Sequence, residues 1–299
     1  DENLNFSKRP IYSFGVNWDV NPIIGIEAKI TNAYGSTPAT GLLTIPSDNK
    51  PLYFVGWSYK PYLSDTILNS PKKEDINTTY GGLTVSNALL PKSGESQIEL
   101  NYDSMGTLFA KYKYSLSNIF QLEILNIGSF KDVNAPPNKD KNIRETYIGE
   151  DYFNYRLGGK FLIFSPEKDD IIWLSTRVSL GRNNKTKQGY VFSELIGSYR
   201  FNEWIMLNIS PKYFFSGVNN LAGMGFSSNL QLLDNLQLIP ELNTNFMRDE
   251  TNYTLALRYI YSSRGSVDFY VSNALGIQDV GQILKADSNR YGIKFNFIY

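Results

Sequence analysis

The sequence contains no histidine and no cysteine, and these two absences exclude most catalytic and metal-binding chemistry. Without histidine, the chain lacks the commonest general base, a Ser-His-Asp triad and imidazole ligands for a metal. Without cysteine, it has no disulfide, no thiolate metal site and no thiol nucleophile. We therefore expect a protein that is not an enzyme and that binds no metal or other cofactor.

The chain also lacks a net charge and a long apolar run. Its 299 residues include 29 basic and 29 acidic side chains, so the formal net charge is zero. Because nucleic-acid binding needs a basic surface, we expect no nucleic-acid partner. No run approaches the roughly 18–20 apolar residues of a membrane-spanning helix. The mean hydropathy of −0.29 is also compatible with strands in which apolar and polar residues alternate.

Aromatic residues are abundant, with 21 Tyr, 18 Phe and 4 Trp making up 14% of the chain. The clearest pattern lies in residues 291–299, where every second residue is apolar or aromatic: Tyr291, Ile293, Phe295, Phe297 and Tyr299. The residues between them are mostly small or polar. Successive side chains of a strand point to opposite faces, so this segment predicts a strand with one apolar and one polar face.

Residues 291–299 resemble the C-terminal signature strand of bacterial outer-membrane β-barrels. The resemblance implies that the apolar face meets lipid and that the terminal aromatic lies at the membrane interface. Similar alternation recurs in many segments, near residues 12–20, 24–30, 53–63, 98–102, 108–116, 120–124, 155–163, 172–180, 195–201, 205–209, 226–232, 236–242, 253–261 and 267–271. No signal peptide begins at Asp1, so an exported chain of this sequence would be a mature protein or a fragment.

This pattern predicts an all-β fold, a single antiparallel transmembrane β-barrel that forms one domain over residues 1–299. A closed bacterial barrel normally has an even number of strands, so we expect about 16, with about 14 as the alternative. Short turns would face the periplasm and longer loops, including 276–287, would lie outside. Residues 64–94 fit the pattern least well, and a plug, an inward loop and a hidden strand all remain open for them.

The polar faces of the predicted strands carry charges of both signs. A water-filled lumen would use such side chains to pass or hold polar solutes. The alternatives are the solvated face of a soluble sheet, or charges that pair inside a closed, non-conducting barrel. The candidate lumen-lining residues are Glu27, Lys29, Glu99, Lys111, Lys113, Glu123, Arg156, Lys160, Arg177, Glu194, Arg200, Lys212, Glu241, Arg258, Asp268 and Lys294.

A second resemblance is carried by residues 81–100, Gly-Gly-Leu-Thr-Val-Ser-Asn-Ala-Leu-Leu-Pro-Lys-Ser-Gly-Glu-Ser-Gln-Ile-Glu-Leu. This stretch is similar to the opening of porin-like barrel domains of the YjbH type, in which a small-residue and proline segment leads into an alternating strand. Residues 41–46 resemble the same stretch of these domains more weakly. The resemblance implies an association with exopolysaccharide export, but no functional residue can be carried over from it.

The leading hypothesis is an integral protein of the bacterial outer membrane, a porin-like channel for passive passage or export of polar solutes. Its expected partners are outer-membrane lipid and small polar solutes or polysaccharide, with further proteins on the periplasmic side left open. One alternative is a plugged structural barrel or one linked to exopolysaccharide secretion. The other is a soluble, secreted, β-rich carbohydrate-binding protein. The sequence names neither a substrate nor an oligomeric state.

Overall fold

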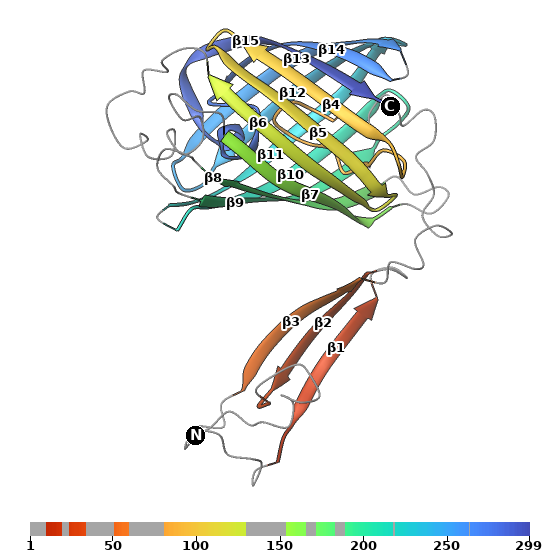
Figure 1. Cartoon of the computed structure of the whole chain (residues 1–299), viewed down its shortest axis with the longest axis vertical. Coiled ribbons are helices and arrows are strands. Elements are labelled where there is room, and N and C mark those ends of the chain that lie inside the picture. Colours follow the sequence, from red (N-terminus) through yellow and green to blue (C-terminus); the bar gives the residue numbers. More distant parts are fainter. Residues whose placement is uncertain are drawn as a thin grey trace. The chain divides into compact units, whose positions relative to one another are not determined.

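The computed structural model describes residues 10–19, 24–33, 51–59, 81–129, 154–165, 172–182, 189–217, 219–262 and 264–299. The chain divides into two compact units, Asp1–Ile67 and Leu68–Tyr299, and each is described by itself. The strands of both units are labelled in Figure 1. No helix in the described part of the chain combines the length and the apolar character needed to cross a membrane.

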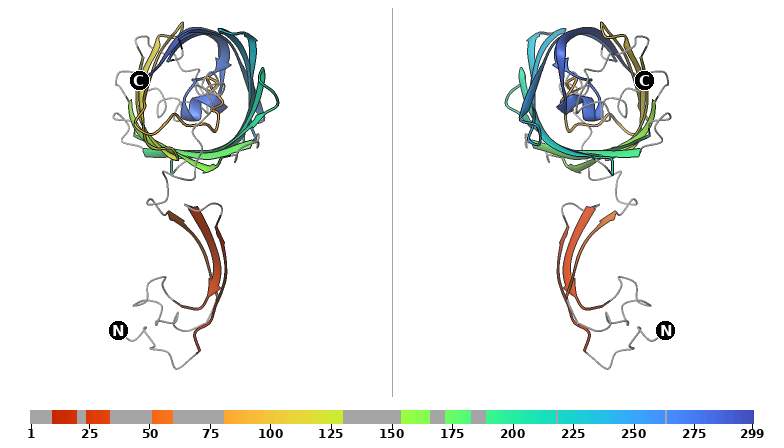
Figure 2. Two further views of the ribbon diagram at one scale, coloured as in Figure 1. Left: turned by 90° about the vertical axis from the view of Figure 1, so that its right-hand side faces the viewer. Right: turned by 90° about the vertical axis from the view of Figure 1, so that its left-hand side faces the viewer.

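The larger unit is a closed antiparallel barrel of twelve strands, each paired with its neighbours in the sequence (Figures 1 and 2). The strands are β4 (Ser96–Asp103), β5 (Thr107–Ser117), β6 (Phe120–Ser129), β7 (Asn154–Phe164), β8 (Ile172–Arg182), β9 (Gly189–Arg200), β10 (Ile205–Phe215), β11 (Asn220–Leu233), β12 (Leu236–Asn245), β13 (Glu250–Ser262), β14 (Gly265–Ala274) and β15 (Lys285–Ile298). The expectation of an all-β, closed antiparallel barrel is confirmed.

The barrel closes between its last strand and its first. β15 pairs with β4 from Gly292 opposite Asp103 to Ile298 opposite Gln97. At the end of this seam, the Tyr299 N–H donates to the Ser96 carbonyl over 2.9 Å, and the Ser96 N–H donates to the Tyr299 carbonyl over 3.0 Å. The C-terminal strand predicted from its alternation is therefore the closing strand of the barrel.

Alternation along each strand separates an apolar exterior from a polar interior. On β13, Tyr253, Leu255, Leu257, Tyr259 and Tyr261 are all exposed, whereas the intervening Thr254, Ala256 and Arg258 are buried inside the barrel. The same separation gives the other strands their alternating burial. An apolar exterior faces lipid favourably, and each barrel strand pairs on both sides, so the ring has no open edge.

The predicted strand number, about 16 or 14, is wrong, because the barrel has twelve strands. Three of the predicted strands form a separate three-stranded sheet in the smaller unit, in the order β1-β2-β3. Their bounds are β1 (Ser13–Asp19), β2 (Ile24–Thr31) and β3 (Leu52–Tyr59). Alternation shows that a strand has one apolar face, but it does not show which other strand completes its hydrogen bonds.

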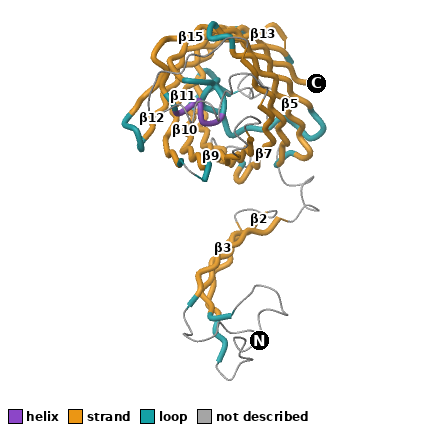
Figure 3. The backbone as a smooth tube through the Cα atoms, turned by 60° about the vertical axis from the view of Figure 1, so that its left-hand side comes forward, coloured by secondary structure: helices purple, strands orange, loops and turns teal. Residues whose placement is uncertain are grey.

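Two segments lie inside the barrel. The first, residues 81–91, is named the strap; it leads into β4, and just beyond it the Gly94 N–H donates to the Ser115 carbonyl over 2.7 Å. The second lies between β14 and β15 and contains the 3-10 helix η3 (Asp279–Ile283), which is purple in Figure 3. Residues 274–284 are all buried, so the prediction that residues 276–287 form an outer loop is wrong for most of that segment.

The loop that contains η3 turns inward because its apolar side chains have an apolar place to pack. Ile277, Val280, Ile283 and Leu284 join a buried cluster with inward-facing side chains such as Phe214 of β10. Other wall members of the cluster are Phe109, Leu125, Ile127, Tyr190, Phe192, Leu221, Ile239 and Tyr270. One part of the barrel interior is therefore an ordinary hydrophobic core, and the strap contributes Leu83 to it.

Candidate functional site: the barrel interior

Glu241 of β12 holds one end of the strap. Its Oε1 accepts hydrogen bonds from the N–H groups of Leu83 and Val85, over 2.8 and 3.1 Å. Its Oε2 accepts from the N–H and the hydroxyl of Thr84, over 2.8 and 2.7 Å. Each carboxylate oxygen thus accepts two donors, and hydrogen bonds to a charged acceptor are the strong ones.

Two lysines hold the strap by its carbonyl groups. Lys160 of β7 donates to the carbonyls of Asn87 and Leu89 over 2.6 and 2.7 Å. Lys212 of β10 donates to the carbonyl of Thr84. Arg258 of β13 also donates to the Gly81 carbonyl over 2.8 Å, and the Ser198 hydroxyl accepts from the Ala88 N–H over 2.8 Å. These contacts use backbone atoms, and no residue of the strap carries a charge.

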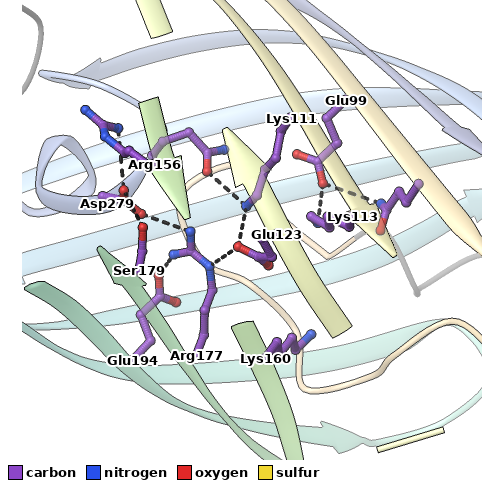
Figure 4. A network of polar contacts seen from close by, with 12 residues as sticks. Glu99, Lys111, Lys113, Glu123, Arg156, Lys160, Arg177, Ser179, Glu194 and Asp279 are labelled. Carbon is purple, nitrogen blue, oxygen red and sulfur yellow. Dashed lines mark hydrogen bonds and ion pairs between the residues drawn. The ribbon is translucent and has the colours of Figure 1, made fainter. Parts of the chain in front are cut away.

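A second network joins the wall to η3 (Figure 4). Arg177 of β8 lies at its centre, 2.6 Å from Glu123, 3.0 Å from Glu194 and 2.9 Å from Asp279. Arg156 lies 3.5 Å from the other carboxylate oxygen of Asp279. All of these side chains are buried. Buried charges are costly unless paired and hydrogen-bonded, and Arg177 meets that condition with all three of its guanidinium nitrogens.

Most other charged wall side chains also lie in ion pairs. The pairs are Lys111–Glu123 at 3.2 Å, Lys294–Glu99 at 3.3 Å, Arg258–Asp268 at 2.6 Å, Arg290–Asp103 at 2.8 Å and Lys113–Glu99. Lys160, Lys212 and Glu241 differ from them, because none of the three forms an ion pair with another described residue. Their hydrogen bonds go to the strap or to uncharged side chains.

Asp279 is the charged group that η3 brings into the barrel. Burial on its own would raise the pKa of Asp279, but the charges of Arg177 and Arg156 outweigh burial and hold that pKa below its usual value. The Ser179 hydroxyl also donates to Asp279 over 3.0 Å. Asp279 is therefore a fixed negative charge that anchors η3 to the wall. In the described part of the chain, no group of three or more acidic side chains is arranged to hold a metal ion.

Little space remains between the strap, η3 and the wall. One cavity there, lined by residues that include Asn87, Leu89, Lys160 and Gln282, measures about 20 Å³. A cavity of that size holds about one water molecule. That cavity therefore has no room for a solute larger than water.

The structure separates the predicted lumen-lining residues into two groups. Glu27 and Lys29 lie on β2 of the three-stranded sheet, 3.3 Å from each other, and not on one of the twelve barrel strands. The others lie on barrel strands and point inward, where Lys113 and Arg200 are half-buried and the rest are buried: Glu99, Lys111, Glu123, Arg156, Lys160, Arg177, Glu194, Lys212, Glu241, Arg258, Asp268 and Lys294. Their contact with a passing solute remains a prediction.

Several interior residues were missed by the sequence reasoning. Asp103 continues the inward-facing series of Glu99 and Asn101, so the alternation of β4 could have identified it. Arg290 belongs to β15 but precedes the regular alternation of residues 291–299. Asp279 and Gln282 stand in a mostly apolar segment, residues 275–284, whose composition could have indicated a buried loop but not the wall partners of these two side chains.

The apolar side chains on the outside of the barrel indicate which class of barrel this is. Large apolar side chains are exposed on strand after strand around the whole ring, among them Leu122, Leu157, Leu180, Leu195, Ile209, Leu242, Leu257 and Phe269. The polar and charged side chains are inside. The fold is that of a porin-like outer-membrane β-barrel.

Solved structures similar to this porin-like barrel are outer-membrane porins and channels. A KdgM porin in complex with disordered oligogalacturonate shares 8% sequence identity, with a TM-score of 0.48 over 68% of this chain and 98% of that one. A NanC porin shares 9% identity, with a TM-score of 0.46 over the same fractions. The COG4313 outer-membrane channel from Pseudomonas putida F1 shares 11% identity, with a TM-score of 0.48 over 71% of this chain and 98% of that one.

Similarity at this level describes the shape of the barrel and nothing about its solutes. No family model matches the chain, and no curated protein matches it. The resemblance of residues 81–100 to YjbH-type barrels, and the link to exopolysaccharide export that it implies, therefore remain predictions. The identification of the fold rests on the closed ring of strands, the apolar exterior and the charged interior.

Proposed function

We propose that this protein is a channel of the bacterial outer membrane for polar solutes, and that the strap closes it. One observation carries the proposal: charged side chains of the wall hold an uncharged internal segment by its backbone. Glu241, Lys160 and Lys212 supply these contacts from three different strands. In a barrel without a channel function, we would expect the polar wall side chains to bind one another rather than a separate backbone segment.

The strap can leave the barrel interior without breaking the barrel. Its hydrogen bonds to the wall can be exchanged for hydrogen bonds to water, since each donor and acceptor is polar. The barrel strands pair with one another without the strap, so its departure leaves the ring intact. The wall that is then uncovered carries charges of both signs, which favours small polar solutes or polysaccharide segments over apolar ones.

The test is conductance of the purified full chain in planar bilayers, with the strap disrupted by Thr84→Pro and Val85→Pro. These changes remove two backbone donors to Glu241 and the Thr84 hydroxyl while leaving every charge of the wall in place. Ser86→Ala is the control, because it changes a strap side chain but no backbone donor. We expect steady channel currents from the proline variant, and rare or no currents from the native chain and the control.

A second candidate is a sealed barrel with a structural role or a role linked to exopolysaccharide secretion. The observation that favours it is the apolar cluster around η3, which is a permanent core rather than a polar plug. If the proline variant stays closed and current appears only after residues 277–283 are also replaced by a short glycine linker, the sealed barrel is correct. The exposed apolar exterior argues against the soluble carbohydrate-binding protein.

A further inference from the structure

We propose that Lys160 is an anion-binding residue of the open channel, occupied by strap carbonyls in the closed state and by anionic groups of a solute when the strap leaves. This inference rests on the proposed channel function and names its class of solute: molecules that carry carboxylate, phosphate or sulfate groups.

The argument begins with the partners of Lys160. Its ammonium group is buried and donates to the carbonyls of Asn87 and Leu89, and it forms no ion pair with another described residue. Other cations in the same interior, such as Lys111 and Arg177, already have carboxylate partners on the wall. When the strap leaves, those pairs persist, whereas Lys160 loses both of its acceptors.

Arg258, Lys212 and Glu241 are the other charged side chains that contact the strap. Arg258 keeps its ion pair with Asp268 when the strap leaves, and Lys212 and Glu241 can neutralise each other. Both contact Thr84: Lys212 its carbonyl, and Glu241 its N–H and hydroxyl. Lys160 contacts the strap at Asn87 and Leu89, farther along the segment. Among the described residues, Lys160 is therefore a wall cation that loses both of its acceptors and has no ion pair to fall back on, and an anionic group offers it a charge-assisted hydrogen bond.

The test uses the strap-disrupted Thr84→Pro/Val85→Pro chain in planar bilayers, with inorganic phosphate as the probe. We expect phosphate to reduce the chloride current through this channel. Adding Lys160→Gln should weaken that block by about tenfold, the value of one charge-assisted contact. Adding Lys111→Gln is the matched control, because it removes the same charge from the interior but from a lysine that is already paired.

The outcomes separate this inference from the proposed function. If the strap-disrupted chain carries no current, the channel proposal fails. If it conducts but phosphate blocks the Lys160→Gln and Lys111→Gln channels equally, the channel stands and the anion site at Lys160 is wrong. A fall in block limited to Lys160→Gln supports the site.

An independent observation concerns the separate sheet of β1, β2 and β3. We infer that one face of this sheet contacts lipid hydrocarbon. Along β1, Phe14, Val16 and Trp18 are 74%, 72% and 64% exposed, and along β3, Tyr53 and Val55 are 78% and 77% exposed. The register places Phe14 beside Ile30 and Val16 beside Ala28 on β2, with Tyr53 and Val55 on the far side of the same two residues. The apolar residues therefore form one continuous patch.

The order of aliphatic and aromatic residues in this patch resembles that of a lipid-facing barrel strand. Its centre is aliphatic, with Val16 and Val55, and aromatic residues lie toward its ends, with Phe14 and Trp18 on β1. β13 of the barrel has the same order on its outer face, with tyrosines toward both ends and Leu255 and Leu257 between them. Exposed aliphatic and aromatic side chains on one face of a sheet are typical of the lipid-facing side of a membrane barrel.

The opposite face of the sheet matches a barrel interior. It carries the Lys29–Glu27 ion pair at 3.3 Å and places the Lys29 ammonium 4.6 Å from the centre of the Phe54 ring. Strands of 7 or 8 residues are close in length to β4, which has 8. Lipid does not tolerate open sheet edges, so β1 and β3 would pair in the membrane with strands beyond the three described ones.

Single-cysteine labelling tests this inference directly, because the chain has no cysteine of its own. An environment-sensitive fluorophore is attached at Val16→Cys or Asn17→Cys in the full chain, reconstituted in phosphatidylcholine vesicles, with Leu257→Cys as the reference on the barrel exterior. We expect a nitroxide-labelled lipid to quench the probes at positions 16 and 257 alike, and position 17 several-fold less. Quenching of position 16 by aqueous iodide, with none by the lipid nitroxide, would overturn the inference.

Discussion

Replacing Glu241 by glutamine should open the channel without disturbing the barrel. The glutamine amide has nearly the same shape as the carboxylate, but only one of its two terminal atoms is an acceptor. One pair of strap donors, either the N–H groups of Leu83 and Val85 or the N–H and hydroxyl of Thr84, then faces an NH₂ group. The pair loses its acceptor while the rest of the wall is unchanged.

The size of the effect follows from those two lost contacts. A hydrogen bond to a charged group contributes about 1.5–3 kcal/mol, net of the hydrogen bonds to water that replace it when the strap is released. Since about 1.4 kcal/mol is a factor of ten, the ratio of open to closed channels should rise by at least about a hundredfold. Single-channel recording measures this ratio as the open probability.

The matched control is Glu194→Gln, which removes the same charge from the interior. Glu194 contacts Arg177 and Ser210 of the wall and has no hydrogen bond to the strap. The reasoning is refuted if Glu241→Gln keeps the native open probability, or if Glu194→Gln raises it as much. Equal effects would mean that the open probability depends on the charge of the interior rather than on the hydrogen bonds between Glu241 and the strap.

Three further predictions concern stability. Replacing Arg177 by methionine leaves Glu123 and Glu194 buried without their main cation, and should cost about 3–5 kcal/mol, measured as a lower urea midpoint of the chain in detergent micelles. The pKa of Asp279 lies below its usual value, so its charged form stabilises the folded chain. That stability is present above the pKa of Asp279 in the unfolded chain and is lost as the pH falls through its pKa in the folded chain. The urea midpoint should therefore decline below about pH 4, and Asp279→Asn should reduce that decline. On the exterior, Leu257→Arg should cost about 2–4 kcal/mol in bilayers and Leu233→Arg, at the end of β11, about 0–1 kcal/mol; equal costs would contradict a lipid-facing band.

The sequence predicted the barrel because alternation is a local property. Each strand displays its own two faces, as residues 253–261 do, and no knowledge of the partner strand is needed to identify them. The inward-facing charges of the barrel could be named for the same reason. Alternation also misled the strand count, since Phe14, Val16 and Trp18 have the same pattern as a barrel strand but belong to another sheet.

The contacts inside the barrel could not be predicted, because they join residues far apart in the sequence. Glu241 and Thr84 are 157 positions apart, and Arg177 and Asp279 are 102 apart. Nothing in the local sequence identifies Asp279 as the partner of Arg177, and nothing in the uncharged strap indicates that it binds four charged side chains. Its backbone makes those contacts, and backbone groups are identical in every sequence.

The position of the strap has a consequence for how the barrel assembles. The β4–β15 seam joins the most distant strands of the ring, and pairing over so long a chain segment is the slowest to form. The strap leads into β4, so it travels with the strand that closes the ring. Closure of the ring and filling of its interior are therefore expected to occur together, late in folding, with the strap entering the interior as β4 pairs with β15.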